Sequence, residues 1–144
     1  VLFIASQNGH LEVARLFLED DRFDPNTLND QGRSALSTAA FNGRDEMVEL
    51  LLEFDNVERD LFDNKHRTAL FLASQENRLD VVKLLLEDPK LNKDIPNDSG
   101  RTPFAIAVKN NYPEMIKLFA ASNADHNLSC TKSYSPIHYA MIHT

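Results

Sequence analysis

The chain has 144 residues, of which 42% are hydrophobic and 26% charged, and 22 acidic against 15 basic side chains give a formal net charge of −7. This composition is ordinary for a folded chain of one domain. The acidic balance argues against nucleic acid binding, because phosphate neutralisation requires a dense basic surface. No apolar run approaches the ~18 residues of a membrane span, and no segment within these residues has the pattern of a secretion signal.

Two helices are predicted at the start of the chain. The first covers residues 1–8, and the second contains Val13, Ala14, Leu16 and Phe17, whose spacing is that of a broad apolar helical stripe. Arg15 falls between the apolar positions and should face solvent. A polar connector over residues 19–26 and the turn formers of residues 29–32 then lead to the next helix.

From there the chain repeats itself at a nearly constant offset. Residues 34–40 match residues 68–74, and residues 47–53 match residues 81–87, both at a distance of 34 residues. Thr102 lies 34 residues after Thr68, and Ser135 lies 33 residues after Thr102. A fixed period of this length indicates stacked repeats. Positions one period apart are called a column below.

Each column has a physical explanation. The hydroxyl column, Ser34, Thr68, Thr102 and Ser135, supplies helix N-caps. Pro103 and Pro136 follow at the first helical position, where a missing N–H costs nothing. Small residues form a packing face on the first helices at Ala5, Ala39, Ala73, Ala107 and Ala140. These helices should end in the left-handed conformation at Gly9, Gly43, Asn77 and Asn111.

The pattern resembles the ankyrin repeat, whose signature is a 33-residue period with Thr-Pro-Leu-His-x-Ala; here Thr102 to Ala107 reads Thr-Pro-Phe-Ala-Ile-Ala and Ser135 to Ala140 reads Ser-Pro-Ile-His-Tyr-Ala. The resemblance implies an all-α, right-handed, curved solenoid of helix-turn-helix units joined by hairpin-like loops. We expect one domain over residues 1–144, with units at about 1–28 (partial), 29–61, 62–95, 96–128 and 129–144 (partial). The partial end units predict an excised stretch of a longer protein. The first three connectors lack the family's glycine, and His66 occupies a glycine column.

Catalysis and metal binding are not expected. His126, Cys130, His138 and His143 are ligand types in a short span, but His138 and His143 are five residues apart and share no helical face. No glycine-rich phosphate loop is present among the four glycines. We therefore expect no enzyme activity, no cofactor and no small-molecule substrate. The single cysteine fits a reducing compartment, so we expect an intracellular, cytoplasmic protein.

The resemblance further implies a partner protein on the concave face, formed by the hairpin tips and the exposed side of the first helices. Carried over by position, the binding residues are Arg33, Phe41, Lys65, Arg67, Gln75, Arg101, Lys109 and Tyr134. Arg33, Arg67 and Arg101 would form a positive ladder suited to an acidic or phosphorylated segment. The alternative is scaffolding, in which the arginines pair with Asp30, Asn64 or Asp98 of neighbouring hairpins.

Phe41 is the other leading candidate, either as an exposed aromatic anchor or as packing against the next hairpin. Two functions stay open at this point. The chain is a non-catalytic protein–protein interaction module, or it is a structural or autoinhibitory array that packs against other domains of its own larger chain. The fold alone does not identify the partner.

Overall fold

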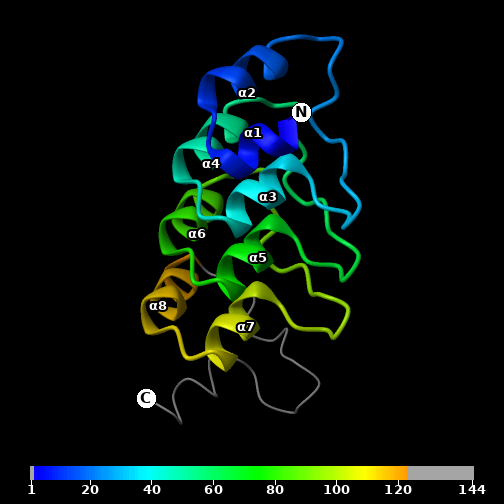
Figure 1. Ribbon diagram of the computed structural model, residues 1–144. Coiled ribbons are helices and arrows are strands. Elements are labelled where there is room, and N and C mark those ends of the chain that lie inside the picture. Colours follow the sequence, from blue (N-terminus) through cyan, green and yellow to red (C-terminus); the bar gives the residue numbers. More distant parts are fainter. Residues whose placement is uncertain (1, 123–144) are drawn as a thin grey trace.

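The computed structural model describes residues 2–122, which form eight helices (Figure 1). Their bounds are α1 (Leu2–Asn8), α2 (Leu11–Leu18), α3 (Ala35–Phe41), α4 (Asp45–Leu52), α5 (Ala69–Gln75), α6 (Leu79–Leu86), α7 (Pro103–Lys109) and α8 (Pro113–Ala121). Apart from one isolated bridge between Phe62 and Thr68, this part of the chain contains no β-pairing. None of these helices has the length and apolar character needed to cross a membrane.

The helices stack in two parallel rows, as Figure 1 shows. Helices α1, α3, α5 and α7 contact one another in sequence, and α2, α4, α6 and α8 form the second row beside them. The connectors that follow α2, α4 and α6 extend beyond the first row as long loops. No helix pair encloses its own apolar surface, so each pair is stabilised mainly by its neighbours.

The predicted helix caps are confirmed at the described positions. Ser34, Thr68 and Thr102 accept hydrogen bonds at the side-chain oxygen from the backbone amides three residues later. Pro103 is the first residue of α7. The first helices are followed by left-handed residues, with φ of 74° at Gly9, 68° at Gly43, 56° at Asn77 and 55° at Asn111. Ser135, Pro136 and Ala140 lie outside the described residues.

The core lies between the two rows. The alanine column of the first helices is fully buried, and so are Met47, Val48 and Leu51 of α4 and their counterparts in α6. The expectation for α2 is only partly met, because Val13 and Leu16 are exposed, Leu16 by 71%. Their counterparts in α4 are buried because α2 packs beside them, whereas no described helix covers the corresponding side of α2.

A hydrogen bond runs from the starts of α4, α6 and α8 back to the preceding unit. Arg44 Nε donates to the Gln7 carbonyl at 3.0 Å, Arg78 Nε to the Phe41 carbonyl at 3.1 Å, and Tyr112 Oη to the Gln75 carbonyl at 3.1 Å. These carbonyls belong to the last turns of the first helices, where no intrahelical partner exists. The column of Arg44, Arg78 and Tyr112 thus completes the helices of the neighbour.

A buried arginine organises the connector after α4. The guanidinium of Arg59 donates to the carbonyls of Leu52 at 2.7 Å and Phe54 at 2.9 Å, and to the Val57 carbonyl. Its Nε also lies 3.1 Å from Asp88 Oδ2, a carboxylate at the end of the next helix pair. Both side chains are buried. This contact ties two successive connectors together.

The column of Asn26 and Asp60 links the connectors a second time. Asn26 uses both ends of its amide, because it accepts from the Glu58 amide and donates to the Asn56 carbonyl, each at 2.8 Å. Asp60 accepts from the Asn92 amide at 3.0 Å, but a carboxylate has no hydrogen for the carbonyl at position 90. Burial, together with the charges of Asp88 and Glu58, raises the pKa of Asp60.

Replacing Asp60 by asparagine should therefore raise the free energy of unfolding by about 1 kcal/mol at neutral pH, the value of one added hydrogen bond.

This gain should depend on pH, because the pKa of Asp60 is higher in the folded than in the unfolded chain. The protonated Asp60 carboxyl stabilises the fold fully below the unfolded pKa of about 3.9, and this stabilisation is lost as the pH rises through the folded pKa. The gain in Asp60→Asn should shrink toward acid pH. Urea unfolding at pH 7 and near pH 3.5 measures it. The reverse exchange, Asn26→Asp, should destabilise the chain at pH 7.

Candidate functional site

Three hairpins of the same construction carry the predicted binding residues. Asn29, Asp63 and Asn97 each accept at Oδ1 from the amides two and four residues later, at 2.9–3.1 Å. The same residues donate their own amides to the carbonyls of Arg33, Arg67 and Arg101. The turn formers noted in the sequence therefore close each hairpin through a side-chain oxygen.

Successive hairpins are also joined at their tips. The Asn64 amide donates to the Gln31 carbonyl at 3.2 Å, and the Asp98 amide donates to the Lys65 carbonyl at 3.1 Å. Gly32 has φ of 76°, and a Cβ there would lie 2.7 Å from Asn64 Oδ1. His66 takes the same left-handed conformation with φ of 59°, which is unfavourable for a residue with a Cβ.

The hairpin face is defined here as residues 28–33, 62–67 and 96–101 together with the helix ends at 41–42, 75–76 and 109–110. On this face, Arg33 and Arg67 both turn toward Asp63. Arg67 Nε and Nη2 lie 2.9 Å from Asp63 Oδ2, and Arg33 Nε lies 3.8 Å from the same oxygen. The predicted pairing partners, Asp30, Asn64 and Asp98, are not used in this way.

Asp63 is the centre of this group, with a side chain only 1% exposed. Burial acts to raise the pKa of Asp63, but the amides of Arg67 and Lys65 and the guanidinium of Arg67 outweigh it and hold the pKa below its ordinary value. Burial and the nearby charge of Arg67 lower the pKa of Arg33. Two members of the predicted ladder are therefore committed to a structural ion-pair cluster.

Phe41, predicted either as an exposed anchor or as packing against the next hairpin, is half-buried. The guanidinium carbon of Arg33 lies 4.4 Å from the centre of its ring, so one face of the aromatic is covered. The Phe41 carbonyl accepts from Arg78, as described above. The ring therefore packs against the Arg33 side chain of its own hairpin.

The remaining predicted binding residues make fewer contacts with acidic side chains in the described part of the chain. Lys65 and Lys109 are exposed, Arg101 is half-buried, and none of the three has an acidic partner among residues 2–122 within ion-pair distance. The half-buried Gln75 donates from its amide to Glu76 Oε2 at 3.3 Å. Tyr134, with Lys132, His126, Cys130, His138 and His143, lies outside the described residues.

Sequence reasoning missed two apolar side chains on the hairpin face. Leu28 is 45% exposed and Phe62 is 47% exposed, and they occupy the same column in consecutive hairpins. The Phe62 ring stacks on the His66 ring with 4.4 Å between centroids. The sequence could have indicated these side chains, because the column of Leu28, Phe62 and Pro96 is apolar although it directly precedes polar turn formers.

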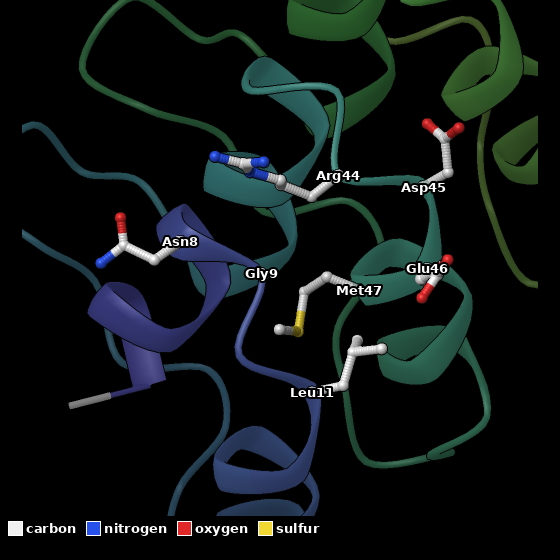
Figure 2. Close-up of a pocket in the computed structure, with 7 residues that line it drawn as sticks. All are labelled: Asn8, Gly9, Leu11, Arg44, Asp45, Glu46 and Met47. Atoms are coloured by element: carbon white, nitrogen blue, oxygen red, sulfur yellow. The ribbon is translucent and has the colours of Figure 1, made fainter.

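A shallow hollow of about 280 Å³ lies elsewhere, between the α1–α2 turn and the start of α4 (Figure 2). It is lined by Asn8, Gly9, Leu11, Arg44, Asp45, Glu46 and Met47. Burial, with the charges of Asp80 and Glu46, raises the pKa of Asp45. Figure 2 shows no nucleophile beside a base in this lining. Within residues 2–122, no group of three or more His, Cys, Asp or Glu side chains could hold a metal ion.

Comparison with protein families fits this geometry. A model described as ankyrin repeats (3 copies) matches residues 2–97, and a single ankyrin repeat matches residues 99–131. The chain belongs to the ankyrin-repeat family. Ankyrin repeats generally act as protein–protein interaction modules and are typically non-catalytic. No curated protein matches this ankyrin chain.

Proposed function

We propose that this ankyrin-repeat chain is a non-catalytic module that binds a partner protein on the hairpin face. The observation that carries the proposal is the pair of exposed apolar side chains, Leu28 and Phe62, beside basic groups without acidic partners in the described chain. An exposed aromatic ring flanked by polar side chains is a typical anchor of a protein interface.

We keep the predicted preference for an acidic or phosphorylated segment, but we assign it to different basic residues. Arg33 and Arg67 already hold the Asp63 carboxylate, so a partner would have to compete with that contact. Lys65, Arg101 and Lys109 have no such competitor among the described residues. We therefore propose these three as the groups that meet partner carboxylates or phosphates.

Affinity capture tests the proposal with variants that leave the ion-pair cluster intact. The binding variant carries Phe62→Ser, Lys65→Glu and Lys109→Glu, and the matched control carries Leu16→Ser and Lys83→Glu, which alter an exposed apolar and an exposed basic residue of the second-helix row. Partners are captured from cells that produce the protein and then titrated in purified form.

A partner bound by the wild type and the control, but at least tenfold more weakly by the binding variant, supports the hairpin face. Equal affinity for all three proteins contradicts it and directs attention to another surface. Thermal unfolding of each variant shows whether a loss of binding reflects loss of folding.

A further inference from the structure

We infer that the partner segment carries one large apolar side chain that packs against Leu28 and Phe62, with carboxylates on one side of it that reach Lys65, Arg101 and Lys109. This inference rests on the proposed function and specifies the chemistry of the ligand. It follows from the uneven distribution of apolar and basic groups along the hairpin face.

The apolar half of the site is built by two consecutive hairpins. Leu28 and Phe62 are one period apart, and the bond between the Asn64 amide and the Gln31 carbonyl fixes the distance between their hairpins. The His66 ring supports the Phe62 ring from one side. Because the aromatic is held before binding, little side-chain freedom is lost when a partner covers it.

The basic half is displaced toward the later units. The hairpin face holds five basic and four acidic side chains, a net charge of +1 on a chain whose total is −7. Asp63 occupies two of the five, Arg33 and Arg67. The other three begin at the second hairpin, whereas the exposed acid Asp30 lies at the apolar end and repels carboxylates there.

Acids of the face also limit where a partner carboxylate can lie. Asp98 is exposed at the third hairpin, and Glu76 accepts from Gln75 beside α5. A carboxylate is therefore favoured close to Lys65 and then to Arg101 and Lys109, and disfavoured at the third hairpin tip itself. The charge pattern defines a direction along the stack.

The repeat sets the spacing of the ligand. Packed helices are about 8–10 Å apart, and an extended chain advances about 3.3 Å per residue. Lys65 lies in the same hairpin as Phe62, and Arg101 lies one period later. An extended partner would therefore place the carboxylate that meets Arg101 about three residues beyond the one that meets Lys65. A helical partner, which rises about 1.5 Å per residue, would need about six residues for this step.

Selection from a displayed library of random 12-residue peptides, with the chain of residues 1–144 as bait, tests the inference. We expect enrichment of peptides with one aromatic or large aliphatic residue and Asp or Glu on one side of it. Synthetic peptides from the selection should bind Phe62→Ser at least tenfold more weakly. They should bind Lys65→Glu at least fivefold more weakly, with the loss reduced at high salt. Leu16→Ser and Lys83→Glu serve as controls and should bind as the wild type does.

Enriched peptides without this one-sided pattern, or with unchanged affinity for Phe62→Ser, would overturn the inference, and so would an absence of enrichment. The proposed function fails separately, when the captured partner protein binds all hairpin-face variants equally. A peptide that requires the hairpin face but lacks carboxylates would refute the inference and leave the proposed function standing.

Discussion

Replacing Arg59 by methionine should lower the free energy of unfolding by about 3–5 kcal/mol, the cost of leaving a buried charge without its partner. The change leaves Asp88 buried without its cation and removes the donor for the carbonyls of Leu52, Phe54 and Val57. Urea unfolding followed by circular dichroism measures the loss. The effect should be among the largest of any polar substitution in the described chain.

Two further variants isolate the ion pair. Asp88→Asn in the Arg59→Met background removes the stranded charge but keeps a side-chain oxygen for the Lys90 amide, and should recover part of the lost stability. Arg15→Met removes two exposed ion pairs, with Glu19 and Glu53, and should change stability by less than about 1 kcal/mol. An Arg59→Met variant as mild as Arg15→Met would show that Arg59 is not the organising group.

Replacing Asp63 by alanine should lower the free energy of unfolding by about 3 kcal/mol, because two backbone amides and the guanidinium of Arg67 lose their acceptor and Arg33 loses the carboxylate that lies 3.8 Å from its Nε. Asp63→Asn should cost less, about 1–2 kcal/mol, since Asn29 and Asn97 show that an amide oxygen closes the same turn. Differential scanning calorimetry of the two variants measures the difference. Equal losses would indicate that the contact with the arginines, and not the side-chain oxygen that closes the turn, accounts for the effect.

The same carboxylate gives a pH dependence of known sign. Because the folded-state pKa of Asp63 is lowered, its contribution is present above the unfolded value of about 3.9 and is lost as the pH falls through the folded pKa. The stability difference between the wild type and Asp63→Asn should therefore shrink as the pH falls below about 4. A difference that stays constant down to pH 2 would contradict the assigned role of the charge.

The helical repeat was predictable from sequence because its determinants are local. The hydroxyl of Thr68 caps the helix that follows within three residues, and Gly43 needs only its own backbone freedom. Such features recur at a fixed period and can be recognised directly in the amino-acid sequence. Leu16 was expected to be buried but is exposed, because burial also depends on what packs beside the helix. The apolar spacing within one helix does not contain that information.

The pairing of charges was less predictable for the same reason. The distance in sequence suggested Asp30, Asn64 or Asp98 for the arginines, but Asp63 is the residue that lies inside the turn and contacts arginines of two hairpins. The ion pair of Arg59 was even less predictable from the sequence, since its partner is 29 residues away and its column holds no second arginine. Phe62 was overlooked because an apolar residue beside a turn reads as ordinary packing until its exposure is known.

The backward hydrogen bonds of Arg44, Arg78 and Tyr112 couple the folding of neighbouring units. In a nearest-neighbour description, each interface term includes a donor from the later unit and a helix-end carbonyl from the earlier one. Loss of either unit removes the whole bond and leaves the donor or the carbonyl to water. These bonds therefore contribute to the cooperativity of unfolding along the array from α1 to α8.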